Sequence, residues 1–231
     1  VQVHDSGVYR HEIGGWVTPL GLALEADGLS AVMLAMTGAV GFAIAAQVSR
    51  TLPVARRPTE PDGAAPWGFW PLWLLLLGGL NALYLSADQF NIYVTLELVG
   101  LSAVGLTALS GTTMAVKAAM RYLLVSLFAS LLYLLGVALL YAGSGVLDMP
   151  AARVLLSDNP AAQLAMVCMI TGLALKTALF PLHFWLPQAH GNALAPVSAL
   201  LSALVIKASF YLIVRLWFYL FAPAGLAVPA M

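Results

Sequence analysis

Long stretches of almost uncharged residues recur along this chain, and no other feature of the sequence constrains its fold as strongly. Each stretch holds about 20 mainly apolar residues, which is enough for an α-helix to cross the ~30 Å hydrocarbon core of a membrane. Short polar or proline-rich segments separate the stretches. We therefore predict an all-α, polytopic membrane helix bundle with about six transmembrane helices, at about residues 28–48, 67–85, 90–109, 118–141, 164–186 and 196–220.

The composition excludes a soluble globule and a nucleic-acid-binding protein. Of the 231 residues, 61% are hydrophobic and only 9% are charged, whereas a soluble domain carries about 25% charge. Ten basic and ten acidic residues balance, so the chain offers no basic surface to nucleic acid. Cys168 is the single cysteine, which leaves no intrachain disulfide and, within the apolar stretch QLAMVCMITG, favours a packing thiol.

Basic residues between the spans predict the orientation of the chain in the membrane. One side would carry five of them, namely Arg50, Arg56, Arg57, Lys117 and Arg121. The opposite side would carry three, namely Arg10, Arg153 and Arg215. This excess predicts that the linker at 49–66 faces the cytoplasm, and we interpret Lys117 and Arg121 as cytoplasmic anchors.

Three ionisable residues fall deep inside predicted spans. Glu97, in the stretch NIYVTLELVG, is the only charge between Asp88 and Lys117 and would lie ~13 Å down its helix. Lys176 and Lys207 would lie ~18 Å and ~16 Å into the fifth and sixth spans. Ionisable residues within a membrane are costly and usually functional.

One acid and two bases in the central zone of the bilayer allow two interpretations. A structural ion pair would lock helices together, but such a pair adds little net stability because desolvation offsets the Coulomb attraction. It would also leave one lysine without an acidic partner in this zone. Burial and neighbouring charges tune such groups for proton exchange near neutral pH. We therefore favour a proton relay formed by Glu97, Lys176 and Lys207.

The fifth span contains a second signal, in the stretch LKTALFPLHFWLPQAH. Pro181 cannot donate a backbone hydrogen bond, so it interrupts the helix five residues after Lys176. Broken spans often line transport sites. His183 and His190 follow the break, and histidine titrates near neutral pH, so either could extend the relay or serve as a hydrogen-bonded structural residue.

Motifs for chemistry of other kinds are missing from the sequence. We identify no glycine-rich phosphate loop, no cofactor fingerprint and no serine-histidine-acid arrangement. We therefore expect neither a cofactor nor a metal in this chain, and no redox or hydrolytic chemistry of its own.

Four segments in order resemble the proton-conducting antiporter-like membrane family. They are GGWVTPLGLALEADGLSAVM, SADQFNIYVTLELVGLSAVGL, YLLVSLFASLLYLLGVALLYAGSGVLDM and LKTALFPLHFWLPQAHGNALAPVSALLSALVIKASFYLIVR, and the resemblance covers about residues 14–217. The family includes the D and A subunits of Mrp-type sodium/proton antiporters and the antiporter-like subunits of respiratory complex I. Relatives occur in membrane hydrogenases and inorganic-carbon uptake systems.

The resemblance implies a fold and a set of roles. The family fold has about fourteen helices with two inverted five-helix repeats, and residues 1–231, as a single transmembrane domain, would match helices three to eight, with one repeat complete. The resemblance implies that Glu97 pairs with Lys176 of the broken helix and that Lys207 carries protons onward. The second repeat is missing, so we expect a fragment of a longer subunit or a naturally split one.

Two details address the branch of the family. Some complex I relatives carry a histidine where this chain has Ser202, so the chain resembles the lysine-bearing branch. The pattern GGW.TP.G, followed by Asp27, resembles Mrp D-type subunits most.

The sequence thus predicts translocation of protons, or of a coupled monovalent cation such as sodium and protons, by a subunit of a multi-subunit antiporter. The alternatives are a proton-pumping subunit of a complex I-type NADH:quinone oxidoreductase or related complex, and a non-conducting scaffold subunit. We expect a multi-pass protein of the bacterial inner membrane whose partners are lipid and other membrane subunits.

Overall fold

The structure, a computed structural model, describes residues 7–16, 21–51, 68–155 and 160–222. Arg56, Arg57 and residues 17–20 of the GGW.TP.G pattern lie outside these ranges. The elements in chain order are β1 Val8–Glu12, η1 Ile13–Gly15, β2 Ala23–Asp27, α2 Gly28–Thr51, α3 Phe69–Leu85, α4 Gln89–Ala108, α5 Thr113–Ser144, α6 Met149–Leu155, α7 Pro160–Lys176, α8 Leu186–Asn192, α9 Ala195–Leu200, η2 Leu201–Val205, α10 Ile206–Leu216 and η3 Trp217–Phe221.

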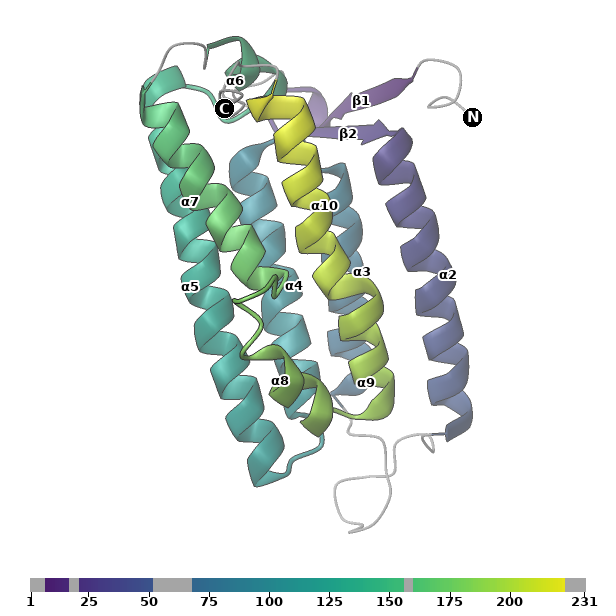
Figure 1. The fold of residues 1–231 in the computed structure, drawn as a ribbon. Coiled ribbons are helices and arrows are strands. Elements are labelled where there is room, and N and C mark those ends of the chain that lie inside the picture. Colours follow the sequence, from purple (N-terminus) through teal and green to yellow (C-terminus); the bar gives the residue numbers. More distant parts are fainter. Residues whose placement is uncertain (1–6, 17–20, 52–67, 156–159, 223–231) are drawn as a thin grey trace.

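The long helices run side by side as a bundle (Figure 1). The short hairpin of β1 and β2 and the helix α6 lie at one end, which we call the hairpin end. The helix α8 lies at the opposite end, which we call the linker end. The segments α9, η2, α10 and η3 form one continuous helix, Ala195–Phe221.

Length and composition separate the helices of the described chain into two groups. Four are long and apolar enough to cross a membrane: Gly28–Arg50, Gln89–Ala108, Thr113–Ser144 and Ala195–Phe221. Two further apolar helices are shorter, Phe69–Leu85 and Ala161–Lys176. These six helices overlap the six predicted spans in position, and four of them have the length and apolarity to cross a membrane.

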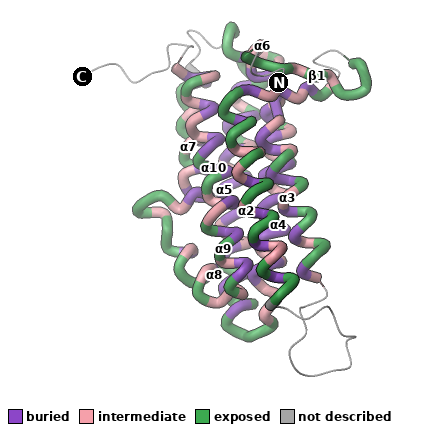
Figure 2. The backbone as a smooth tube through the Cα atoms, turned by 90° about the vertical axis from the view of Figure 1, so that its right-hand side faces the viewer, coloured by how far each residue is buried: buried purple, intermediate pink, exposed green. Residues whose placement is uncertain are grey.

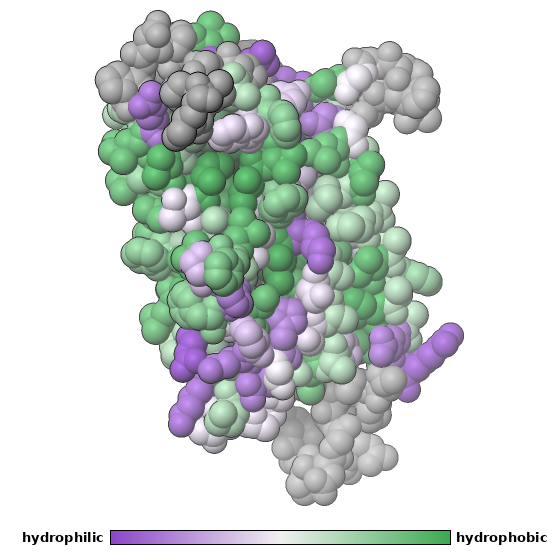
Figure 3. Space-filling model, viewed as in Figure 1, coloured by the Kyte–Doolittle hydropathy of each residue, from purple (hydrophilic) through white to green (hydrophobic). Residues whose placement is uncertain are grey.

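The outer surface of the bundle is suited to lipid. Exposed residues alternate with buried ones along the helices (Figure 2), and large apolar side chains such as Phe42, Leu124 and Phe128 are more than 60% exposed. Figure 3 shows hydrophobic residues over most of the middle of one face, with hydrophilic residues gathered toward its lower end. Apolar surface of this extent is stable only in a membrane or against other subunits.

Local signals explain where the central helices begin and how closely they pack. The Asp88 side chain accepts a hydrogen bond from the Asn91 amide at 2.8 Å and caps α4. Thr112 caps α5 in the same manner. Gly172 lets α7 approach α5, because a Cβ there would lie 2.5 Å from the Ala129 carbonyl oxygen.

The break in the fifth span lies closer to Lys176 than predicted. The sequence predicts a helix to about residue 186 with an interruption at Pro181, but α7 ends at Lys176 itself. A proline ring clashes with the carbonyl four residues earlier, here that of Thr177, so the helix must end before it. Ala178 has a φ of 56°, and the Phe180–Pro181 peptide bond is cis.

The structure contains a short β-hairpin that the predicted all-α fold did not include. Its strands pair antiparallel, with Tyr9 opposite Ala26. The sequence does not mark β2 because two of its three inward-facing residues are acids: Glu25 is 4% exposed and Asp27 is 9% exposed, beside the buried Ala23. Buried acids need partners, and the partners of Glu25 are Arg10 and Arg215.

Candidate functional site

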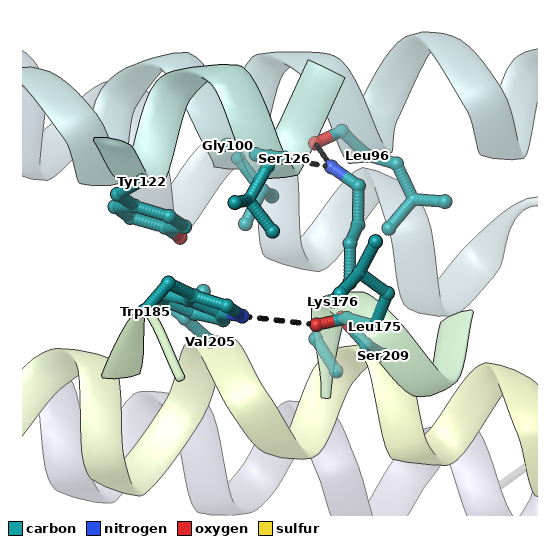
Figure 4. Close-up of a pocket in the computed structure, with 12 residues that line it drawn as sticks. Leu96, Gly100, Tyr122, Ser126, Leu175, Lys176, Trp185, Val205 and Ser209 are labelled. Carbon is teal, nitrogen blue, oxygen red and sulfur yellow. Dashed lines mark hydrogen bonds between the residues drawn. The ribbon is translucent and has the colours of Figure 1, made fainter. Parts of the chain in front are cut away.

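The last residue of α7, Lys176, lies in the middle of the bundle and is 9% exposed. Its ammonium nitrogen Nζ donates a hydrogen bond to Ser126 Oγ of α5 at 3.0 Å (Figure 4). A second bond goes to the Leu96 carbonyl of α4 at 3.4 Å. Three helices therefore converge on this one charge.

Glu97 lies beside Lys176 but is not hydrogen-bonded to it. Its Oε1 is 3.9 Å from Lys176 Nζ, and its side chain is 18% exposed. The same Oε1 is buried and has no hydrogen-bond partner among the described residues. The structure thus brings Glu97 and Lys176 together and leaves a short gap between the carboxylate and the ammonium.

Sequence analysis missed two residues that shape this contact. Ser126 is an uncharged residue in an apolar helix, so nothing in its local pattern marked it. Gly100 leaves the room that the contact needs, because a Cβ there would lie 2.9 Å from Ser126 Oγ and 3.3 Å from Lys176 Nζ. The signal available in the sequence was a glycine three residues after Glu97, on the same face of the helix.

A cavity of about 10 Å³ adjoins Lys176, and α10 contributes Ser209 to its wall while the preceding turn η2 contributes Val205. This volume suits about one water molecule. Tyr122 and Trp185 also line it, stacked with ring centroids 4.5 Å apart (Figure 4).

Trp185 stabilises the broken end of α7. Its indole nitrogen donates a hydrogen bond to the Leu175 carbonyl at 3.1 Å. The last carbonyls of a helix lack intrahelical partners, so this bond satisfies one of them directly before Lys176. Through this bond, the segment that follows the break contacts the last turn of α7.

Lys207 lies apart from the Lys176 site on the exposed side of α10. Its Nζ donates to the Ser202 carbonyl at 2.6 Å, within the π-helical turn η2. π-helical turns inside α-helices are frequent at functional positions. Among the described residues, the hydrogen bonds and ion pairs connect Lys176 with Glu97 and not with Lys207.

The two histidines differ in their surroundings. His183 is exposed and packs its ring near Phe180, with centroids 5.7 Å apart. His190, in the short helix α8 between the spans, shares a hydrogen bond of 3.0 Å with Ser198 through Nδ1. Burial, and then the charge of Lys207, lower the pKa of His190. Of the two, His190 therefore lies in the electrostatic range of Lys207.

A second cluster of charges, at the hairpin end, was not predicted. Arg215 is 2% exposed, and its guanidinium lies 3.4 Å from Glu25 Oε1 and donates to the Tyr84 carbonyl at 3.1 Å. Arg10 bridges Glu25 at 3.7 Å and Asp148 at 2.7 Å. The network joins the hairpin to α3, to α10 and to the start of α6. At the linker end, Arg121 donates to Gln188 of α8.

Comparison with known proteins identifies the family. Residues 86–228 match the family model described as NADH:quinone oxidoreductase/Mrp antiporter, TM. The NADH-quinone oxidoreductase subunit N of Desulforudis audaxviator is 37% identical over 226 residues, covering 96% of this chain and 44% of that protein. The D-type subunit of the Na(+)/H(+) antiporter of Alkalihalophilus pseudofirmus is 30% identical over 224 residues, covering 96% of this chain and 44% of that protein.

Solved structures show the same relation. A chain of the membrane-bound sulfane sulfur reductase, an archaeal respiratory membrane complex, superposes with a TM-score of 0.85 at 32% identity and covers 95% of this chain and 44% of that one. The chain thus spans less than half the length of the relatives that it matches. It belongs to the NADH:quinone oxidoreductase/Mrp antiporter transmembrane family.

Proposed function

We propose that this chain translocates protons as part of a multi-subunit membrane complex, with Glu97, Lys176 and Lys207 as the relay. The observation that carries the proposal is the 3.9 Å separation of Glu97 Oε1 and Lys176 Nζ, at the broken end of a membrane helix. A buried acid and base at this distance interact strongly, so the protonation of one alters the proton affinity of the other. Because Glu97 lies too far away to form a hydrogen bond with Lys176, the ammonium group of Lys176 is suited to releasing its proton.

Small movements of Lys176 can change its partner. Its present acceptors, Ser126 Oγ and the Leu96 carbonyl, are both uncharged. A shift of about an ångström toward Glu97 would convert the 3.9 Å contact into a charge-assisted hydrogen bond. We infer two states, in which Lys176 is bound to Ser126 or to Glu97, and proton transfer occurs as the lysine changes between them.

Transfer onward to Lys207 requires water, because no direct contact joins the two lysines in the described chain. The cavity beside Lys176 is lined by Ser209 of α10, the helix that carries Lys207, and suits about one water molecule. His190 lies within the electrostatic range of Lys207 and supplies a second titratable group near the linker end. The exposed His183 has a weaker position for this role.

The names of the relatives suggest two alternative sources of energy for proton transport. One carries the name of a sodium/proton antiporter subunit, and the other that of an NADH-quinone oxidoreductase subunit. We propose that partner subunits supply either a sodium gradient or a redox reaction, and that the complex lies in a bacterial inner membrane. The relatives are more than twice as long as the region matched here, and helices equivalent to their remaining parts would complete the route across the bilayer.

A scaffold subunit that moves no ions is the competing function, since buried polar groups can also serve helix packing. The variant Glu97→Gln discriminates between the two. The amide keeps the size of the carboxylate but cannot take up a proton, so a relay loses transport and a scaffold keeps it.

The test uses the full assembly in sealed vesicles, with a dye that reports internal pH. Lys176→Ala should abolish proton movement while the amount of assembled complex stays the same. Sodium pulses given to the intact complex identify antiport, and added NADH or another reductant identifies the redox-driven branch. Proton movement at the wild-type rate in Lys176→Ala would contradict the relay.

A further inference from the structure

A stripe of buried polar side chains continues from Lys176 along α5 toward the hairpin end. Ser126, Ser130 and Tyr133 follow one another at i, i+4 and i+7, so they share one face of the helix. Their exposed fractions are 6%, 1% and 0%. Ser126 contacts Lys176, and the Tyr133 hydroxyl donates to the Gln89 carbonyl at 3.5 Å. The stripe therefore runs from Lys176 to the first turn of α4.

Polar atoms along this stripe lack partners. Ser130 Oγ has no hydrogen-bond partner among the described residues, and the same holds for both Nε2 and Oε1 of Gln89. The Gln89 side chain belongs to a residue that is 0% exposed. Orphaned buried groups are rare in folded proteins, and ordered water satisfies most of those not paired with protein atoms. Two residues with such groups, on facing helices along one line, indicate water between α4 and α5.

The hairpin end of the stripe meets a hollow of about 240 Å³ lined by Asp88, Tyr141 and Asp148. Asp88 directly precedes Gln89, and the Gln89 amide donates to the Leu147 carbonyl at 3.0 Å in the wall of the hollow. Both carboxylates already have partners. Asp88 accepts from the Asn91 amide, and Asp148 pairs with Arg10. The hollow is thus better suited to water than to a bound cation.

We propose that Ser126, Ser130, Tyr133 and Gln89 form a hydration site, and that its water connects Lys176 with the hollow at the hairpin end. Each hydroxyl and each water can accept one proton and release another, so a proton passes along the file without any net chemical change. This route differs from the one toward Lys207, because it leaves Lys176 along α5 rather than along α10. Its use in transport rests on the proposed relay, whereas its hydration does not.

Thiol reactivity tests the hydration directly. The variant S130C, in the full assembly in sealed vesicles, is treated with a small water-soluble methanethiosulfonate reagent. The reagent attacks thiolates, which form only where water reaches the sulfur. The native Cys168 is buried in α7 and serves as an internal control in the same molecule. Peptide mass spectrometry measures the labelling at each position.

We expect the thiol at position 130 to react at least roughly tenfold faster than Cys168. Equal or slower labelling at position 130 would overturn the proposal, because a dry interface leaves both thiols protonated and inaccessible. Cys168 is 9% exposed and Ser130 is 1% exposed, so simple surface exposure predicts the opposite order.

A matched pair of serine variants tests the role in transport. Ser102 is 1% exposed, like Ser130, but its hydroxyl donates to the Leu98 carbonyl at 2.6 Å. We expect S130A to slow proton movement about three- to tenfold, through loss of a group that positions water, and S102A to leave the rate unchanged. If Ser130 instead lies in a dry interface, S130A removes an unpaired hydroxyl and raises thermal stability without changing the rate.

The two proposals fail in distinguishable ways. Transport that survives Lys176→Ala while the thiol at position 130 reacts rapidly would refute the relay and support the hydration site. Transport that Lys176→Ala abolishes, together with an unreactive thiol at position 130, would support the relay and refute the hydration site.

Discussion

Two buried cations lie in the part of this bundle that the structure describes, and they are held in opposite ways. At the hairpin end, Arg215 uses both terminal nitrogens, for Glu25, for the Tyr84 carbonyl and for the Tyr211 hydroxyl. Near the middle, Lys176 donates only to uncharged groups, and its acidic neighbour Glu97 stays 3.9 Å away.

The difference separates a structural charge from an exchangeable one. A guanidinium remains protonated in proteins and offers a rigid set of donors, so Arg215 is suited to joining the hairpin to α10. An ammonium can lose its proton, and its single nitrogen can turn from one acceptor to another. The loose contact at Lys176 is therefore the one that can carry protons, although both residues are buried cations near an acid.

The largest expected effect is the loss of stable complex in Arg215→Met. Removing one partner of a buried ion pair costs about 3–5 kcal/mol, and the buried Glu25 would keep only its longer 3.7 Å contact with the partly exposed Arg10. We expect little assembled complex by gel filtration in detergent. Arg121→Met is the control, since Arg121 is exposed and bonds only Gln188 among the described residues. A normal yield of Arg215→Met would show that the network does not hold the hairpin.

The next effect tests the same distinction from the other side. In Lys176→Arg, the charge remains but the proton is not released, so transport in vesicles should fall by about 100-fold or more. The amount of assembled complex should change little. Lys117→Arg is the control at an exposed position outside the relay. Transport near the wild-type rate would mean that the charge of Lys176 matters and its proton does not.

These two cations also show how far sequence reasoning reaches. Lys176 stood out because no other charge lies near it in the chain and a proline follows. Arg215 lies at the end of a predicted span, where basic residues usually face water, so its burial was not foreseen. Its partner Glu25 precedes the first span, and only the inward-facing strand β2 brings the two together.

The helices themselves were predictable, because length and apolarity determine where a chain can cross a membrane. The contacts between them were less so. Ser126 carries no charge and breaks no pattern, yet it provides the shortest hydrogen bond to Lys176. Its role depends on how deeply α5 and α7 approach each other, which follows from small residues such as Gly172 on facing helices. Spacing along one helix does not reveal that approach.

A smaller effect concerns the broken end of α7. Trp185→Phe leaves a smaller aromatic ring to stack on Tyr122 but loses the hydrogen bond to the Leu175 carbonyl, a change of about 1 kcal/mol. We expect transport to slow a few-fold, because Lys176 directly follows that carbonyl. Trp73→Phe is the matched control, since the buried Trp73 indole nitrogen has no partner among the described residues. Equal transport rates in Trp185→Phe and Trp73→Phe would show that the Trp185 hydrogen bond does not affect the function of Lys176.

The smallest effect is a pH dependence at the linker end. The pKa of His190 is lowered by burial and by the charge of Lys207, so the folded state favours the neutral ring. The corresponding stability is present above the ordinary histidine pKa of about 6.5 and is lost as the pH falls through the lower folded value. His190→Asn removes this dependence.

Between about pH 7.5 and about pH 5, the unfolding midpoint of the wild type should therefore fall by about 1–2 °C more than that of the variant. The hairpin end is the same in the wild type and the variant, so it should contribute nothing to the difference between them. An equal fall in both proteins would assign the acid sensitivity to groups other than His190.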